Sequence, residues 1–391
     1  MKLPENKDIK KIFKYHRICV LKVYLLLIQK VISEKTCCLY KLADSIEGNT
    51  KFDSKYKRLL RFFTIKCSYN FCLCSGILII SLILSFPINS KDIYLAMDRT
   101  NWKIGAFNIN PLFLGLILPN KIFIPLIWIP LEKRGNSNQN ERIDLLEKFI
   151  NLWSLQIKDK QMVLLADREF IGDKWLKWLK EKKFSFVIRL RENMYFNNLA
   201  EILKRDKYQI EKYIIKKTRK DGSFVIPIEI NGEALYYVAT ENKRQEGAEK
   251  FCCFITDRND AEWTKQAYEQ RWNIEVFFKH IKTNGFNLED MNLKEIDKVR
   301  LIISVVSVAY VLCLKEGIIQ NEIKPIKLKK DFKTDKTWKS VSLFRLGIRY
   351  LKQNFKELDF MINNIIQQIN KNVIINQEFI KKSTIPILKS V

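Results

Sequence analysis

Three acidic residues stand where a carboxylate would need a partner. Asp98 and Asp167 each follow a short apolar run typical of a buried strand, and Glu275 lies within an amphipathic helical pattern. A buried carboxylate costs desolvation energy unless it is paired, and a divalent cation is a natural partner. Two strand acids and one helix acid can hold a pair of Mg²⁺ ions at a phosphodiester. Each strand acid taken alone is more typical of a capping or salt-bridged aspartate.

The helical segment around Glu275 strengthens the metal interpretation. Tyr268, Arg271, Glu275 and Lys282 follow one another at intervals of 3, 4 and 7 residues, so a helix would place them on one face. Basic groups on both sides of an acid suit contacts with phosphates. The alternative is a surface ladder of ion pairs, because Arg271–Glu275 and Glu275–Lys279 are both spaced i, i+4.

The overall charge favours a polyanionic partner. The 391 residues include 69 Lys and Arg against 43 Asp and Glu, which gives a net charge of +26. A chain this basic most often binds nucleic acid and less often an anionic membrane surface. The excess is concentrated near the two ends, with +10 in residues 1–66 and +9 in residues 321–391.

The cysteines and histidines argue against other site types. Nine cysteines without paired C-x-x-C motifs, together with only two histidines, indicate neither a zinc site nor a disulfide framework. We expect reduced, cytosolic thiols, and the first residues show no secretory signal. No charged residue occurs from 67 to 90, a stretch long enough for a transmembrane helix, but polar residues interrupt it and a buried core helix is the preferred interpretation. A second apolar run, 301–314, is too short to span a membrane.

The pattern along the chain predicts six regions. A basic helical DNA-binding region is followed by an apolar connecting helix, the first part of an α/β core, a β-rich insertion, a helical return to the core and a helical C-terminal region for dimerisation or DNA contact. Their bounds are 1–66, 67–91, 92–190, 191–259, 260–290 and 291–391. Within the insertion we expect strands at 208–217, 223–230, 234–240 and 251–255, and in the core a hairpin joining 111–118 to 122–131.

Three motifs together resemble a known family. Tyr268-x2-Arg271-x3-Glu275-x6-Lys282 is similar to the Y-R-E-K signature of the bacterial insertion-sequence DDE transposases called family four. Asp98-Arg-Thr-Asn-Trp resembles the first-acid motif of that family, and Asp167-Arg-Glu-Phe resembles its second, where Glu169 replaces a common glycine. The resemblance covers residues from about 56 to 350, with the three acid motifs in the family's order.

The resemblance implies a fold and a set of roles. The fold is α/β, an RNase H-like catalytic core interrupted by a β-rich insertion, which fits the separation of 108 positions from the second acid to the third. Asp98, Asp167 and Glu275 would be the catalytic, metal-binding triad for two Mg²⁺ ions, with Mn²⁺ as a substitute. Contacts to the transposon end would come from the basic and aromatic residues of the signature and from one strand position, namely Tyr268, Arg271, Lys279, Lys282 and Arg189.

The implied activity is cleavage of DNA at terminal inverted repeats and transfer of the 3′-ends to a target. The partners would be double-stranded DNA and a second copy of the chain, in the cytoplasm at the nucleoid, without a membrane. Some relatives trap a flipped base with an aromatic residue. Trp263, Tyr236 and Tyr237 are candidates here, but structural packing is the preferred role for each of them.

Three other functions remain open at this stage. Another RNase H-like nuclease, such as a junction resolvase, would lack the Y-R-E-K face and the large insertion. A non-enzymatic DNA-binding protein derived from a transposase would not need an intact triad. A membrane protein would rest on residues 67–90 alone.

Overall fold

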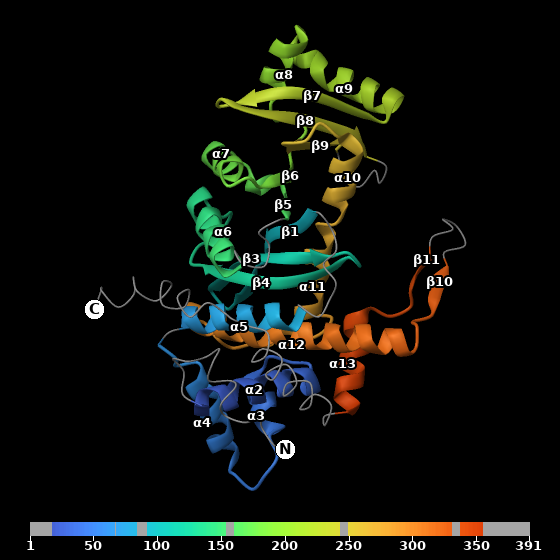
Figure 1. Ribbon diagram of the computed structural model, residues 1–391. Helices are drawn as coiled ribbons and strands as arrows, with labels where there is room; N and C mark the ends of the chain where they lie inside the picture. The colour runs from blue at the N-terminus through green and yellow to red at the C-terminus, as the bar shows by residue number, and fades with distance from the viewer. Residues whose placement is uncertain are drawn as a thin grey trace.

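A mixed sheet with helices around it forms the centre of the molecule. The computed structural model describes residues 18–66, 68–83, 92–153, 160–242, 249–330 and 337–354. Their largest sheet has nine strands in the order β2-β3-β1-β5-β6-β9-β8-β7, with β4 beside β3. Figure 1 shows this sheet in the upper part of the molecule, above two long helices. The expected α/β class is confirmed.

Five strands form the part of the sheet that fits an RNase H-like core. They are β1 (Asp92–Arg99), β3 (Phe107–Leu118), β4 (Ile122–Leu131), β5 (Gln161–Ala166) and β6 (Ser185–Arg189). The first three are antiparallel in the order β1-β3-β4, whereas β5 and β6 run parallel to β1 on its other side. A short strand, β2 (Trp102–Ile104), pairs with β3. The predicted hairpin is confirmed, with Lys121 at a φ of 61° in its turn.

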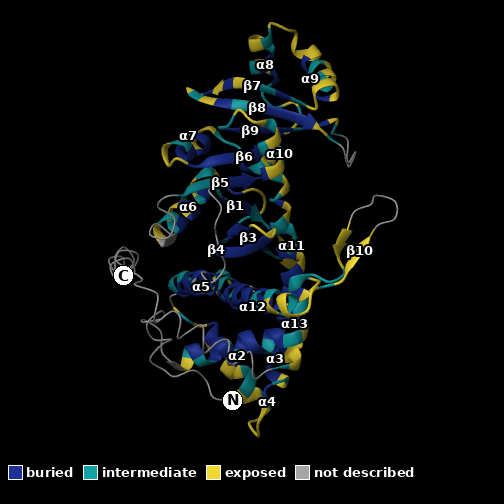
Figure 2. Ribbon diagram, turned by 45° about the vertical axis from the view of Figure 1, so that its right-hand side comes forward, coloured by how far each residue is buried: buried dark blue, intermediate teal, exposed yellow. Residues whose placement is uncertain are grey.

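Helices cover the central strands, whose middle residues are apolar and buried. Leu95 of β1 and Leu164 of β5 are fully buried, as expected for parallel strands with both faces covered. Figure 2 shows the buried strands between partly exposed helices. The helices around the core are α6 (Gln139–Trp153), α7 (Asp173–Glu181), α10 (Ala261–Glu269) and α11 (Trp272–Ile281).

The insertion extends the same sheet and begins with helices. Strands β7 (Ser223–Ile230), β8 (Glu233–Glu241) and β9 (Phe251–Thr256) follow α8 (Phe196–Leu203) and α9 (Lys207–Asp221). Because β9 pairs antiparallel with β6, the insertion continues the core sheet. The three predicted strands from 223 onward are confirmed, but the strand predicted at 208–217 is wrong.

Helix α9 occupies that segment for local reasons. The Asp206 side chain caps the helix by accepting a hydrogen bond from the Tyr208 N–H, and Gly222 ends it at a φ of 77°. Ile210, Ile214 and Thr218 are buried at intervals of four residues. That spacing places one side of a helix against the sheet, whereas a strand would alternate.

A helical layer lies beneath the sheet in Figure 1, with α12 (Ile296–Ile323) beside α5 (Ser68–Ile83). Of the described helices, α12 alone is long and apolar enough to cross a membrane, and 83% of its most apolar window is buried inside the protein. It is longer than the run at 301–314 suggested. Residues 68–83 form the expected core helix, while 67 and 84–91 lie outside the described residues.

The terminal regions pack against α12. Helices α2 (Ile18–Glu34), α3 (Leu39–Asp44) and α4 (Phe52–Phe62) lie on its far side, and α13 (Leu343–Gln353) crosses it closely. A Cβ atom at Gly347 would lie 1.7 Å from the Cys313 carbonyl oxygen, so only glycine permits this crossing. The C-terminal region also contains strands β10 (Leu328–Lys330) and β11 (Thr337–Lys339), where helix was expected. The eight described cysteines are free thiols.

A buried histidine makes the packing of α11 sensitive to acid. His280 is 9% exposed and its ring centroid lies 4.5 Å from that of Phe344. Burial, with a smaller contribution from Arg345, lowers the pKa of His280 to about 4. The unfolded chain therefore binds a proton at a higher pH than the folded protein does, and stability falls as the pH drops from about 6.5 toward 4.

We predict that a drop from pH 7 to pH 5 lowers the free energy of unfolding by about 2 kcal/mol through this histidine alone. The measurement is urea unfolding at both pH values for the wild type and for His280→Phe, which cannot be protonated. The variant should lose clearly less stability over that interval. Equal losses in both proteins would contradict a neutral buried imidazole.

Candidate active site

The strand register brings the first two predicted acids together. Met97 of β1 pairs with Ala166 of the parallel strand β5. Asp98 and Asp167 come directly after these paired residues, at the same edge of the sheet. Both side chains are partly buried. The short helix η1 (Arg168–Phe170) begins immediately after Asp167 and leads the chain away from the sheet.

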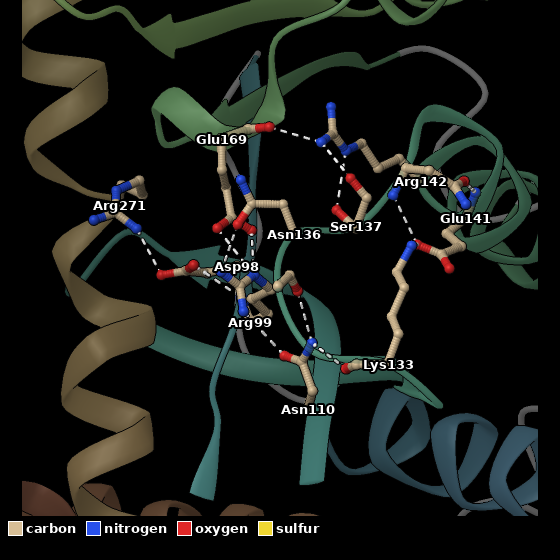
Figure 3. A network of polar contacts seen from close by, with 12 residues as sticks. Asp98, Arg99, Asn110, Lys133, Asn136, Ser137, Glu141, Arg142, Glu169 and Arg271 are labelled. Atoms are coloured by element: carbon tan, nitrogen blue, oxygen red, sulfur yellow. Dashed lines mark hydrogen bonds and ion pairs between the residues drawn. The ribbon is translucent and has the colours of Figure 1, made fainter. Parts of the chain in front are cut away.

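Arg271 connects Asp98 with the third predicted acid. Its Nη1 donates to Asp98 Oδ2 at 2.7 Å, and its Nη2 forms an ion pair with Glu275. The guanidinium is almost completely buried, since Arg271 is 8% exposed. Figure 3 shows Arg271 reaching from its helix toward Asp98. The guanidinium of Arg271 thus joins Asp98 of the strand to Glu275 of the helix.

The expected continuous helix is interrupted at Arg271. Helix α10 ends at Glu269 and α11 begins at Trp272, and the N–H groups of Gln270 and Arg271 donate to carbonyls three residues earlier. Such tight turns shift the positions of the following side chains relative to an ideal helix. The residues expected on a single helical face are therefore divided between two helices, and Arg271 lies at the junction between them.

Tyr268 adds the second strand acid to this network. Its hydroxyl donates to Asp167 Oδ1 at 3.2 Å, and its ring packs against Phe254 with the centroids 4.9 Å apart. The guanidinium carbon of Arg271 lies 5.7 Å from the centre of the same ring. The structure therefore connects five of the predicted site residues through direct contacts, namely Asp98, Asp167, Tyr268, Arg271 and Glu275.

The network has an electrostatic cost that Arg271 offsets. Burial and, to a smaller extent, the Asp167 carboxylate raise the pKa of Asp98, whereas Arg271 acts in the opposite direction, and the net pKa is about 6. Burial alone would lower the pKa of Arg271, but Tyr268 and the three acids keep it well above its usual value. Burial also raises the pKa of Tyr268, which stays a neutral hydrogen-bond donor.

The remaining predicted DNA-contacting residues lie outside this network. Lys282 Nζ donates to the Asn101 carbonyl oxygen at 2.9 Å and pairs with Glu289 at 2.9 Å. Lys279 is exposed, with its ammonium 4.9 Å from the ring centre of Trp272. Arg189, at the end of β6, forms an ion pair with Glu249.

The aromatic candidates for a base trap differ in exposure. Tyr237 is fully buried, whereas Tyr236 is half-buried. Trp263 is also half-buried, and the Arg258 guanidinium lies 4.0 Å from its ring centre. Tyr237 is therefore a core residue, and Arg258 already covers one face of Trp263.

A comparison with known protein families adds independent information. Residues 127–312 match the family described as the transposase DDE domain. The match contains Asp167, α10 and α11 and begins after Asp98. The match covers slightly less than half of the chain. It supports a DDE transposase, an enzyme of mobile DNA. A search of curated proteins found no match to the chain.

The DDE domain has carboxylates of the type that divalent ions prefer. DDE transposases generally use such metals, and the network's acids offer only oxygen ligands, which suit Mg²⁺. Within the described ranges, no three His, Cys, Asp or Glu side chains are grouped as ligands of one ion. Arg271 explains the arrangement, since its guanidinium supplies the positive charge between Asp98 and Glu275. Binding of a metal by both acids would require this guanidinium to move.

Sequence analysis missed a second ion pair that links the two acid motifs. Arg99 Nε donates to both oxygens of Glu169 at 2.7 and 2.9 Å, while its other nitrogens donate to Asn110 and Asn136. Buried Arg142 donates to the Glu169 carbonyl oxygen at 2.6 Å. Figure 3 shows Arg99 at the centre of this cluster. The one signal in the sequence was the glutamate at a position where glycine is common.

We predict that Glu169→Gln lowers the free energy of unfolding by about 1–2 kcal/mol. The change removes the charge that pairs with the largely buried Arg99 side chain. The matched control is Glu229→Gln, an exposed glutamate on β7, which should change stability by less than about 0.5 kcal/mol. Urea unfolding of both variants measures the difference, and equal effects would show that the Arg99 ion pair is energetically unimportant.

Proposed function

We propose that this DDE transposase cuts DNA at the terminal inverted repeats of an insertion sequence and transfers the 3′-ends to target DNA by two-metal phosphoryl transfer. The observation that carries the proposal is the contact network of Asp98, Asp167 and Glu275 through Tyr268 and Arg271. Three acids from two adjacent strand ends and one helix converge there. The spacing of the Y-R-E-K signature supports assignment to family four.

The three acids would hold the Mg²⁺ ions, for which Mn²⁺ could substitute. When bound, the ions would activate a water or a 3′-hydroxyl and stabilise the leaving oxygen. The parallel register makes the backbones of Asp98 and Asp167 neighbours, which supports a shared role for the two carboxylates. The ion pair between Arg99, at the end of β1, and Glu169, in η1, joins the two acid motifs.

Arg271 would exchange partners during the reaction. Asp98 and Glu275 would hold the ions, whose charge would replace that of the guanidinium, and a planar guanidinium suits a phosphate group in the same way as a carboxylate. Tyr268 stays a neutral donor and orients Asp167. Lys282, Lys279 and Arg189 would contact the transposon end beside the acids, the first and third after release from Glu289 and Glu249.

The net charge of +26 supports double-stranded DNA as the partner, both as transposon end and as target. Among the N-terminal helices, α4 carries exposed basic residues such as Arg58 and Arg61, which supports end recognition by this region. We further propose a homodimer in the DNA complex, acting in the cytoplasm at the nucleoid without a membrane.

The first prediction from this proposal concerns the metal. The purified protein should cut a duplex that carries the inverted repeat flanking its own gene in Mg²⁺ or Mn²⁺, and EDTA should abolish cutting, because three carboxylates cannot polarise a phosphodiester on their own. In Ca²⁺ the protein should bind the duplex without cutting it. Undiminished cleavage in EDTA would contradict metal-dependent chemistry.

The second prediction separates roles along the α10–α11 segment. Glu275→Ala should leave binding of the end duplex nearly intact and eliminate strand cleavage, since its task is metal ligation. Arg271→Ala and Lys282→Ala should weaken binding and lower the slope of log affinity against log salt by about 1 each. Glu269→Ala, an exposed acid at the end of α10, is the matched control and should keep full activity.

Gel-shift and cleavage assays on one end duplex measure these effects for all four variants. If Glu275 belonged only to a surface ion pair, its loss would cost a few tenths of a kcal/mol of stability and leave activity unchanged. Retained cleavage by Glu275→Ala would remove the triad assignment.

A further inference from the structure

A basic pocket of about 380 Å³ lies beside the acid network. The β2–β3 hairpin forms one wall, and the segment that follows β4 forms the other. The side chains that matter for its chemistry are those of Asn101, Trp102, Lys103, Asn108, Lys133 and Arg134. Neither the family signature nor the comparison assigns a role to this pocket.

The lining contains cations and amides but no carboxylate. Lys103 and Arg134 are exposed and form no ion pair within the described part of the chain, whereas Lys133 pairs with Glu141 at 2.9 Å. Unpaired cations beside amide donors are the groups that bind phosphate oxygens in protein–DNA contacts. The chemistry of the pocket therefore favours an anionic ligand with several oxygen acceptors.

Two hydrogen-bonded links connect the pocket to the candidate active site. Lys282 donates to the Asn101 carbonyl oxygen and lies 5.3 Å from the ring centre of Trp102. On the other side, Asn110 accepts from Arg99, the neighbour of Asp98, and donates to the carbonyl oxygens of Lys133 and Gly135 at 3.2 and 2.9 Å.

Asn110 is buried and fixes the pocket wall relative to the acids. It is 2% exposed, and Figure 3 shows it between Arg99 and Lys133. Asn101 comes three residues after Asp98 in the chain and, at the mouth of this pocket, accepts the hydrogen bond of Lys282. The pocket is therefore a preformed extension of the site.

We propose that this pocket binds a backbone phosphate of the cleaved DNA strand, next to the scissile phosphodiester. The inference rests on the proposed function and adds a specific contact to it: Lys103 and Arg134 neutralise the phosphate, and Asn101 and Asn108 donate hydrogen bonds. Together with Lys282, the pocket fixes the strand on the side of the acids opposite to the insertion.

The test compares two double variants that remove the same charge. The double variant Lys103→Ala/Arg134→Ala removes the two cations of the pocket that form no ion pair in the described part of the chain. Lys212→Ala/Lys216→Ala removes two exposed, unpaired lysines from α9, which line another basic hollow at the far end of the insertion. Neither change touches the acid network, so both variants should fold like the wild type.

Binding of the end duplex is measured in Ca²⁺ between about 50 and 200 mM salt. Each lost phosphate contact lowers the log–log slope by about 0.9, which means that the wild type loses about threefold more affinity over this range per contact. The pocket variant should show this reduced slope, and the α9 variant should not. A series of duplexes with a neutral methylphosphonate at one position of the cleaved strand then locates the contact.

One position near the cut should weaken binding of the wild type and have no further effect on the pocket variant. Equal slopes for the wild type and the pocket variant, with normal cleavage by both, would contradict the proposed phosphate contact in the pocket. The proposed function would remain intact. Equal losses in both double variants would also contradict this phosphate contact, because they would reflect total charge alone. A wild type that neither binds nor cuts the duplex would overturn the proposed function and the pocket with it.

Discussion

The buried guanidinium of Arg271 is the interaction on which the candidate site depends. Asp98 and Glu275 are partly buried, and the guanidinium pairs directly with both, so that its positive charge offsets theirs. The break between α10 and α11 occurs at this residue and places the guanidinium between strand and helix. In the proposed reaction, metal ions held by the carboxylates would leave the same group available to a DNA phosphate.

The rest of the fold serves to position these groups. Parallel pairing of β1 with β5 makes Asp98 and Asp167 neighbours, and the Arg99–Glu169 pair joins the end of β1 to the η1 helix that follows β5. Helix α11, which carries Glu275, packs on α12 through His280 and its aromatic neighbours. The acids therefore lie on elements whose backbones are fixed by the sheet and by the apolar helical layer below it.

Sequence alone predicts the parts of this site that depend on local patterns. An apolar run that ends in an acid identified both Asp98 and Asp167, and the spacing from Tyr268 to Glu275 identified the helix acid. At 208–217 the aromatic and β-branched residues suggested a strand, but the four-residue spacing of Ile210 and Ile214 and the Asp206 cap favour the observed helix. The ion pair of Glu169 with Arg99 and the hydrogen bond of Lys282 to Asn101 join segments far apart in the chain, so no local pattern could reveal them.

The most direct test of metal-dependent cleavage at these acids is a sulfur substitution at the scissile phosphate. Two end duplexes carry sulfur at one or the other non-bridging oxygen of that phosphate, and cleavage is compared in Mg²⁺ and in Mn²⁺. Because Mg²⁺ prefers oxygen ligands and Mn²⁺ tolerates sulfur better, at least one of the two duplexes should be cut slowly in Mg²⁺ and at a restored rate in Mn²⁺. Equal relative rates in both metals for both duplexes would contradict direct metal contact with the phosphate.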